Sequence, residues 1–307
     1  MSTPTGGRQT KNERREQARE QARQLREAAK KKERRNRILL QGGIIVAVIA
    51  VVAVIAIVIV SSVKPAGPGP RNMASDSLLV QPGGAVAETP GLQPGATPTP
   101  NPQPTGDDVI RIQTFVDYMC PYCGLFEQTN AQYIQTLVDS GAASLEIFPI
   151  SFLDRLSLGT AYSTRAANAF ACVADEQPDK ALAFHELLFE NQPAESSSGL
   201  SDDQIIEFAR QAGAKSTSVE SCIRDQKFKG WVAAATERAQ SVSGVTGTPT
   251  VIVNGQIYSG TVFGQSYNGS LTDQATFRQF VAAAQGVQYV EQTQSTPAPT
   301  PTPTPSG

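Results

Sequence analysis

The chain has 307 residues with 26 basic and 28 acidic side chains, which give a formal net charge of −2 at pH 7. This near-neutral total hides an asymmetry, because the first 37 residues hold thirteen Lys or Arg against five Glu. Those glutamates are interspersed among the basic residues and few aromatic residues lie nearby, so nucleic acid is excluded from the expected partners. The length allows one large or two small domains, but only about 185 residues have the pattern of folded structure.

An almost wholly apolar stretch follows the basic segment 1–37. Residues 38–60 are interrupted only by a Gln-Gly-Gly run, and as a helix they would reach roughly 34 Å, enough for the ~30 Å hydrocarbon core of a bilayer. A cleavable signal peptide is the alternative, but its apolar region is shorter and no small-residue cleavage site follows here. The sequence therefore predicts a transmembrane anchor over residues 38–63, with the amino terminus in the cytoplasm and the rest of the chain outside the cell membrane.

Two further segments have the composition of linkers. Residues 64–106 are crowded with Pro, Gly and Thr and lack the apolar spacing of a core, so we expect a tether there. Residues 289–307 include a Thr-Pro repeat, and we expect them to be disordered. The expected folded domain lies between these segments, over residues 107–288.

A Cys-Pro-Tyr-Cys sequence, from Cys120 to Cys123, lies near the start of this domain. Residues 109–116 predict a short strand, and residues 124–137 predict an amphipathic helix. The cysteines therefore lie at a strand-to-helix turn, where unsatisfied backbone N–H groups and the helix dipole favour a thiolate on Cys120. Pro121 suits the first helical turn because no N–H is needed there. A lowered thiol pKa stabilises the reduced pair, which makes the disulfide an oxidant.

The four cysteines would lie in an oxidising compartment, where three disulfide connectivities are possible. The short spacing favours Cys120 with Cys123, which leaves Cys172 and Cys222, each on a predicted helix, to form a structural disulfide. Such a bridge would close a loop of about 50 residues and stabilise the fold by up to ~4 kcal/mol. A second redox-active pair is the alternative. His185 is the only histidine and the spacing matches no common zinc site, so the sequence predicts no metal, no cofactor and a structural role for His185.

The rest of the domain combines strands and helices. After a predicted strand over residues 144–150, about ninety residues are helical in pattern and form an insertion at about 155–243. A Gly-Thr-Pro-Thr sequence at 247–250 then leads into a strand at 251–253, an Asn-Gly hairpin and a partner strand. We expect a final helix over residues 272–284.

This arrangement resembles the thioredoxin-fold proteins of the DsbA group. The likeness rests on the Cys-Pro-Tyr-Cys after a first strand, the helical insert, and the Thr-Pro before a Val-Ile-Val-Asn-Gly hairpin. It covers about residues 107–288, and the anchor, the linkers and the second cysteine pair are most similar to the membrane-anchored versions found in actinobacteria. The resemblance implies an α/β thioredoxin fold with an inserted helical domain, preceded by one transmembrane helix.

The resemblance also implies roles for residues near the dithiol. Cys120 would be the outward nucleophile and Cys123 the buried resolving partner. Pro249 would be cis and would face this pair, with the main chain of Thr248 turned outward to bind an extended substrate strand.

Two positions depart from the family pattern. Many relatives carry a buried acidic residue six positions before the nucleophile, and this chain has Thr114 there, so the proton of the second cysteine must leave by another route. Asp117 is the nearest carboxylate and could assist, or it could be an exposed residue at the strand end. Tyr122 stands where the best-known oxidases carry histidine, which indicates a milder oxidant.

The residues and the resemblance together predict a membrane-anchored, extracytoplasmic thiol:disulfide oxidoreductase that introduces disulfides into exported thiol-containing proteins. Its reoxidant would be a quinone-linked membrane protein of the DsbB or vitamin K epoxide reductase type. A reductase or isomerase of the same fold is the alternative, because isomerases of this fold often carry threonine at the position of Thr248. An alternative of another class is a redox-inactive binding or chaperone module.

Overall fold

The computed structural model describes residues 67–102, 109–259, 261–262 and 264–295, and a few isolated positions between 20 and 32. The chain divides into two units, Met1–Lys64 and Pro65–Gly307, and the strands and helices below lie in the second. The expected anchor at 38–63 falls outside the described residues. Within the described ranges, no helix is long and apolar enough to cross a membrane.

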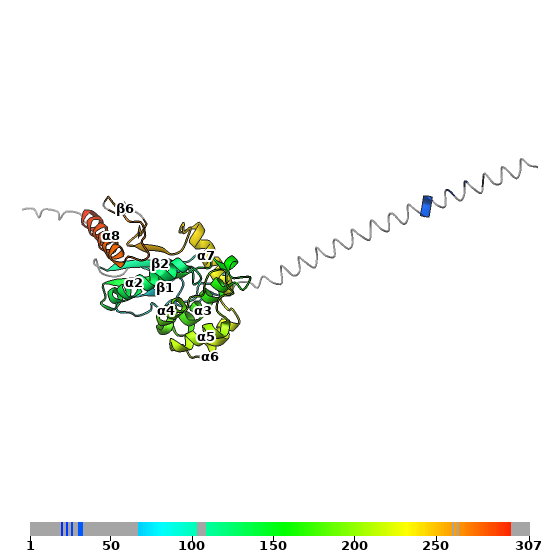
Figure 1. Ribbon diagram of the computed structural model, residues 1–307, viewed down its shortest axis with the longest axis horizontal. Helices are drawn as coiled ribbons and strands as arrows, with labels where there is room; N and C mark the ends of the chain where they lie inside the picture. The colour runs from blue at the N-terminus through cyan, green and yellow to red at the C-terminus, as the bar shows by residue number, and fades with distance from the viewer. Residues whose placement is uncertain are drawn as a thin grey trace, which may run out of the picture. The chain divides into compact units, whose positions relative to one another are not determined.

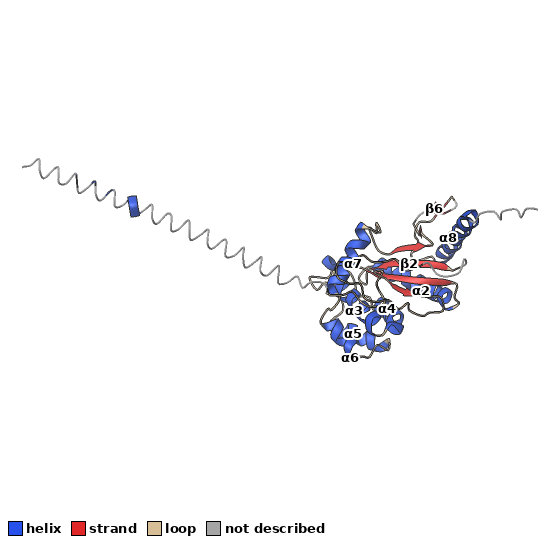
Figure 2. Ribbon diagram, turned by 180° about the vertical axis from the view of Figure 1, so that it is seen from behind, coloured by secondary structure: helices blue, strands red, loops and turns tan. Residues whose placement is uncertain are grey.

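A five-stranded sheet, drawn in red in Figure 2, is the framework of the second unit. Its order is β1-β3-β2-β4-β5, in which β2 and β3 are parallel and the other neighbours are antiparallel. The strands are β1 (Leu78–Val80), β2 (Ile110–Val116), β3 (Ala143–Pro149), β4 (Thr250–Val253) and β5 (Gln256–Ile257). A separate hairpin pairs β6 (Thr261–Val262) with β7 (Gln265–Ser266).

The central strand β2 is covered on both faces. On one face, Ile112 and Val116 belong to the large hydrophobic core that also contains Phe126. On the other face, Phe115 stacks on Phe148 of β3 with ring centroids 4.2 Å apart. The first four residues of the strand alternate between apolar and polar, whereas burial on both faces at its end leaves Thr114, Phe115 and Val116 all buried.

Helices cover the sheet and form a separate group beside it. They are α2 (Pro121–Asp139), α3 (Tyr162–Glu176), α4 (Ala181–Glu190), α5 (Asp202–Gln211), α6 (Thr217–Arg224), α7 (Lys229–Ser241) and α8 (Gln274–Ser295). Figures 1 and 2 show α3, α4, α5 and α6 gathered together, whereas α8 lies near β6. This arrangement confirms the expected α/β thioredoxin fold with an inserted helical region. Helix α8 continues past the expected domain boundary at 288.

Helix α3 is the centre of the helical group, because α4, α5, α6 and α7 all contact it. It is buried along nearly its whole length and is rich in alanine, at Ala166, Ala167, Ala169, Ala171 and Ala174. Such small side chains let several helices approach one axis closely. At the start of α5, Ser201 and Gln204 form a capping box, in which the side chain of each residue bonds to the main-chain N–H of the other.

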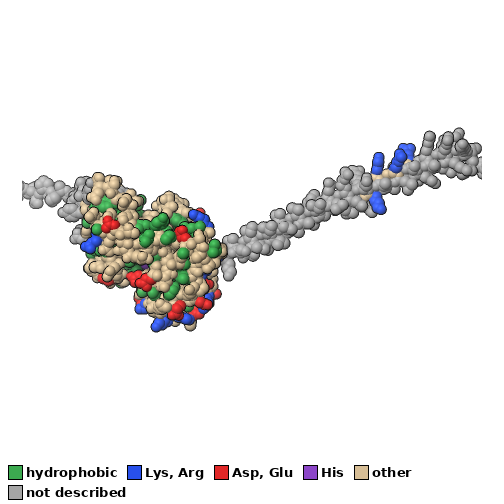
Figure 3. Space-filling view, in the orientation of Figure 1, with side chains coloured by type: hydrophobic (Ala, Val, Ile, Leu, Met, Phe, Trp, Pro, Cys, Tyr) green, Lys and Arg blue, Asp and Glu red, His purple; other side chains and the backbone are tan. Residues whose placement is uncertain are grey.

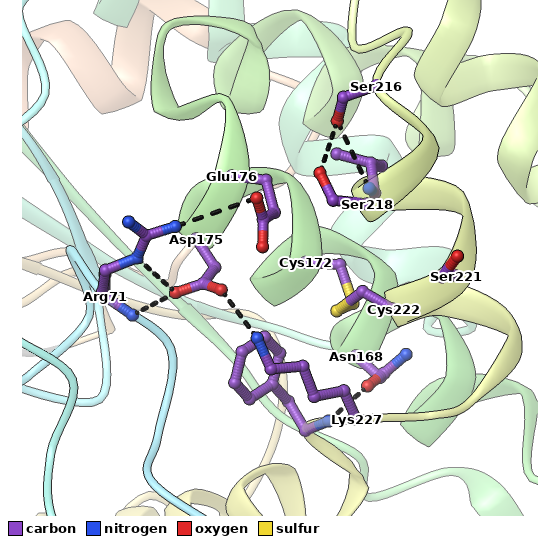
Figure 4. Close-up of a disulfide and its surroundings, with 12 residues drawn as sticks. Arg71, Asn168, Cys172, Asp175, Glu176, Ser216, Ser218, Ser221, Cys222 and Lys227 are labelled. Carbon is purple, nitrogen blue, oxygen red and sulfur yellow. Dashed lines mark hydrogen bonds and ion pairs between the residues drawn. A yellow bond between two sulfur atoms is a disulfide. The ribbon is translucent and has the colours of Figure 1, made fainter.

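A disulfide joins Cys172 on α3 to Cys222 on α6, with Cα atoms 5.8 Å apart (Figure 4). This is the structural pairing that the sequence favours. Cys172 is fully buried and Cys222 is 5% exposed, so the bond is closed to solvent. It links two segments that are 50 positions apart, and the entropy model for a loop of that length assigns it about 4 kcal/mol of stabilisation.

The segment expected to be a linker, 64–106, contains part of the fold. Strand β1 adds antiparallel to β3 at the edge of the sheet, and Leu78 and Val80 are buried in the core. The expectation of a free tether is wrong for this stretch because three apolar residues are enough to extend a sheet that already exists. The surrounding Pro and Gly dominate the composition and hide so short a strand.

Polar contacts fasten the same segment to the helices. The main-chain N–H and the Nε of Arg71 donate to Oδ1 of Asp175 on α3, at 2.8 and 3.0 Å (Figure 4). Burial opposes the charge on Asp175, but hydrogen bonds from Arg71 and Lys227 hold its pKa below the usual value. Arg238 on α7 donates two hydrogen bonds to the carboxylate of Asp76, at 2.6 and 2.7 Å. The folded domain therefore begins well before residue 107.

Charged side chains of both signs gather on one part of the surface. Figure 3 shows Lys and Arg side chains beside Asp and Glu side chains at the outer end of the helical group. On helices α5 and α6, Arg210 and Arg224 pair with Glu220, and Arg224 also contacts Asp203. These pairs are exposed to water, so they contribute little to stability.

Candidate active site

The two cysteines lie where β2 passes into α2. Cys120 is the N-cap residue of α2, Pro121 is at its first turn, and Cys123 lies inside it. The carbonyl of Cys120 accepts hydrogen bonds from the main-chain N–H groups of Cys123 and Gly124, at 3.0 and 3.2 Å. Cys120 keeps 4% of its surface exposed and Cys123 keeps none. A partner can therefore reach only the first sulfur.

The surroundings give the two thiols opposite acidities. A hydrogen bond from the Cys123 thiol, opposed by partial burial, lowers the pKa of Cys120 to about 6, aided by the Thr248 hydroxyl and by the backbone N–H groups of Cys123 and Tyr122. Burial raises the pKa of Cys123 well above its usual value, and the interaction with Cys120 raises it further. Near neutral pH the reduced pair therefore carries a thiolate on Cys120 and a thiol on Cys123.

The Thr248–Pro249 bond faces this pair and is cis. The thiol of Cys120 donates to the carbonyl of Thr248 with the heavy atoms 3.2 Å apart. A groove of about 220 Å³ runs from Thr248 to Tyr122, which is 59% exposed. Its other lining residues include Pro249, Thr250, Val251, Ile257, Tyr258 and Leu271. The groove is next to the nucleophile, and both apolar and polar residues line it.

Asp117 lies at the end of β2 and is fully buried, not exposed. Its Oδ1 accepts from the main-chain N–H of Met119 at 2.8 Å, and its Oδ2 accepts from that of Leu153 at 2.9 Å. Burial raises the pKa of Asp117 to about 6, although these hydrogen bonds oppose the rise. The carboxylate thus shapes the turn before Cys120 and ties it to the loop that follows β3.

Gln192 is a site residue that no local motif indicates. Its Nε2 donates to the carbonyl of Cys120 at 2.8 Å and to that of Tyr118 at 3.2 Å. Gly124, directly after the second cysteine, makes room for it, because a Cβ there would collide with Oε1 of Gln192. A glycine inside a helix costs about 1 kcal/mol relative to alanine, and this unfavourable residue is the one trace of the contact in the sequence.

A buried polar cluster lies behind the pair. The hydroxyl of Tyr118 is 3.0 Å from Nδ1 of His185, and Nε2 of His185 is 3.4 Å from Oε1 of Glu127. His185 is 2% exposed on α4. Thr114, in the place of the family's acidic residue, donates its hydroxyl to the carbonyl of Glu146 at 3.5 Å.

The geometry agrees with comparisons to known proteins. A family model described as Thioredoxin matches residues 109–273, more than half of the chain. The serine/threonine-protein kinase PknE of Mycobacterium tuberculosis is 33% identical over 147 residues, which cover 46% of this chain and 26% of the kinase. The chain thus spans about a quarter of the length of the curated relatives it matches.

Solved structures show the same likeness. Oxidised DsbA from Mycobacterium tuberculosis is 29% identical with a TM-score of 0.50, and the match covers 72% of this chain and 100% of that one. Oxidised BdbD from Bacillus subtilis is 18% identical with a TM-score of 0.51, covering 73% of this chain and 100% of that one. At the lower identity the likeness concerns the fold alone.

The acidity of Cys120 predicts the pH dependence of its alkylation. Because the thiolate is the reactive form, the rate with iodoacetamide should rise with a midpoint near the pKa of about 6, below the ~8.5 of a free cysteine. Cys123→Ala should move the midpoint upward, and Thr248→Val should move it upward by less, because the Cys123 hydrogen bond is the larger cause. A wild-type midpoint at 8 or above would contradict the assigned environment.

The contact between Gly124 and Gln192 predicts that Gly124→Ala changes the free energy of unfolding in opposite directions with and without the Gln192 side chain. Gly124→Ala should lower the free energy of unfolding while Gln192 is present, because the new methyl group displaces the glutamine from two carbonyls. In a Gln192→Ala background the same change should raise the free energy of unfolding by up to ~1 kcal/mol, since alanine favours the helix. Urea denaturation measures both, and the same sign in both backgrounds would rule the contact out.

Proposed function

The chain is a thiol:disulfide oxidoreductase of the DsbA type that belongs to the thioredoxin family, and we propose that it works as an oxidase that introduces disulfides into exported proteins. The unequal chemistry of the two cysteines carries the proposal. The pKa of Cys120 is about 6, whereas burial raises that of Cys123. Stabilising one thiolate stabilises the reduced pair, so the disulfide is driven to accept electrons.

The proposed reaction begins with the oxidised pair. A substrate thiolate attacks Sγ of Cys120, the bond to Cys123 breaks, and the bond electrons remain on the Cys123 sulfur, which takes up a proton. A second thiolate of the substrate then attacks the substrate sulfur of this mixed disulfide. Cys120 leaves as a thiolate, which its surroundings favour, and the substrate departs with a new disulfide. Two electrons have passed to the cysteine pair.

The groove beside Thr248 suits an extended polypeptide as the substrate. In the proposal, the main chain of a client strand pairs with Thr248 and places its thiolate over Cys120. The apolar residues that line the groove, among them Ile257 at 51% exposed, would accept side chains of unfolded clients without selecting one sequence. Asp117 would hold the turn in the geometry that keeps Cys120 facing this groove.

The proposed setting follows from the amino-terminal part of the sequence. An anchor at 38–63 would hold the enzyme in the cell membrane with the dithiol on the extracytoplasmic side, where clients emerge as thiols. The reduced pair would be reoxidised by a quinone-linked membrane protein of the DsbB or vitamin K epoxide reductase type. A second candidate, a reductase or isomerase, is favoured by the threonine at position 248 before Pro249.

The reduction potential of the Cys120–Cys123 pair distinguishes these functions. We expect a value less negative than the roughly −270 mV of thioredoxin, because the reduced form is stabilised by the Cys120 thiolate. Tyr122→His should make the value less negative still, because a cation near the sulfur favours the thiolate. Equilibration with glutathione buffers measures both, and a potential at or below that of thioredoxin would leave the reductase as the better assignment.

Trapping of mixed disulfides tests the clients and the compartment together. Cys123→Ala removes the resolving thiol, so cells with this variant should accumulate Cys120-linked complexes that dissociate in reductant. The captured chains should be exported proteins. Cys120→Ser/Cys123→Ala is the matched control and should capture none. Capture of mainly cytoplasmic proteins would contradict the extracytoplasmic location, and capture of none would contradict the role of Cys120.

A further inference from the structure

Cys123 must lose a proton when the disulfide forms and regain one when it is reduced. The chain has Thr114 at the strand position where many relatives carry an acidic residue that accepts this proton. Cys123 is fully buried, and the same burial that raises the pKa of its thiol keeps it protonated at neutral pH. To close the disulfide it must become a thiolate. Thr114 occupies the strand position, and its hydroxyl is engaged with a main-chain carbonyl, so it does not serve as a base.

Glu127 on α2 is positioned to exchange a proton with Cys123. It lies four residues after Cys123 on α2, so the two side chains project from the same side one turn apart. The Glu127 side chain is 12% exposed, which leaves a narrow path from the interior to water. A small cavity of about 20 Å³ is lined by Thr114, Glu127 and His185, which is room for one water molecule.

Two further side chains continue from Glu127 into the interior, as far as the Tyr118 hydroxyl. Nε2 of His185 lies 3.4 Å from Oε1 of Glu127, and Nδ1 lies 3.0 Å from the Tyr118 hydroxyl. Tyr118 is fully buried. After burial itself, the charges of Glu127 and Cys123 contribute to raising its pKa. The tyrosine thus lies within electrostatic reach of both the carboxylate and the buried sulfur.

We propose that Glu127 accepts the proton of Cys123 through the chain of Tyr118 and His185, and returns it when the disulfide is reduced. In the closing step Cys120 is already bonded to a partner sulfur. The Cys123 proton passes to the Glu127 carboxylate, and the Cys123 thiolate attacks Sγ of Cys120. The partner leaves as a thiolate, so the cysteine pair is oxidised by two electrons and the partner is reduced. This inference rests on the proposed roles of Cys120 and Cys123, and it holds for either direction of the reaction.

Other titratable groups face this cluster and are less suited to the task. Both oxygens of Asp117 already accept main-chain N–H groups. Burial raises the pKa of Tyr162 at the start of α3, so its hydroxyl stays protonated at neutral pH and does not act as a base. Glu186 on α4 lines the same cavity, but the residue is exposed to solvent. After partial burial, the negative charge of Glu190 on the next turn contributes to raising the pKa of Glu186.

A two-phase reaction with 5,5′-dithiobis(2-nitrobenzoate) isolates the closing step in the reduced full-length protein. The first thionitrobenzoate is released when Cys120 attacks the reagent, at a rate proportional to its concentration. The second is released when Cys123 closes the disulfide, at a rate independent of concentration. Glu127→Gln should slow the second phase at pH 7 by roughly 100-fold and leave the first within about twofold. Tyr118→Phe, which removes one oxygen, should slow the second phase in the same way.

Controls separate this inference from the roles on which it rests. Glu186→Gln removes a charge from the same cavity and should leave both phases unchanged. In Glu127→Gln the pH profile of the second phase should move to higher pH, which a merely structural role would not produce. A wild-type second phase in Glu127→Gln or Tyr118→Phe, or slow closure only in Asp117→Asn, would overturn the proposal. Release of two equivalents by Cys123→Ala would instead overturn the assigned role of Cys123.

Discussion

The reactivity of this protein depends on a contact between two residues 128 positions apart, Cys120 and Thr248, whose Sγ and carbonyl oxygen lie 3.2 Å apart. Strand pairing creates it, because the register that sets Phe115 of β2 opposite Thr250 of β4 brings the residues before β4 beside the end of β2. A slip of one residue would turn every side chain of β4 to the other face of the sheet. The sheet as a whole therefore places the Thr248 hydroxyl, which helps the Cys123 thiol to lower the pKa of Cys120.

The helical insertion supplies the rear of the site. Gln192, just after α4, fixes the carbonyls of the cysteine turn, and His185 on α4 meets Tyr118 behind the pair. Asp117 reaches the loop that leads into the insertion through Leu153. The sheet and α2 place the sulfur atoms, and the insertion controls the polar groups around them. A change in the packing of α3 or α4 would therefore alter the dithiol without touching it.

Sequence patterns revealed the features that are local. Cys120 and Cys123 are one short motif, Thr248 and Pro249 precede a strand with a clear hairpin, and Cys172 and Cys222 remained once the close pair was assigned. The contacts of Gln192 and the proposed role of Glu127 were missed because they arise only when α2 and α4 pack together. Strand β1 was missed for a related reason: its three residues become a strand only against the edge of β3.

The chain holds four cysteines, and the fold separates them into two pairs that do not exchange disulfides with each other. The Cys172–Cys222 bond is closed inside the helical group, with Cys172 fully buried, so it cannot recharge the pair at the start of α2. Each molecule therefore carries a single two-electron equivalent. In the proposed oxidase reaction, the output of each molecule over time would be set by how often its cysteine pair is reoxidised, so a cell could increase that output through the supply of the proposed reoxidant as well as by making more of the enzyme.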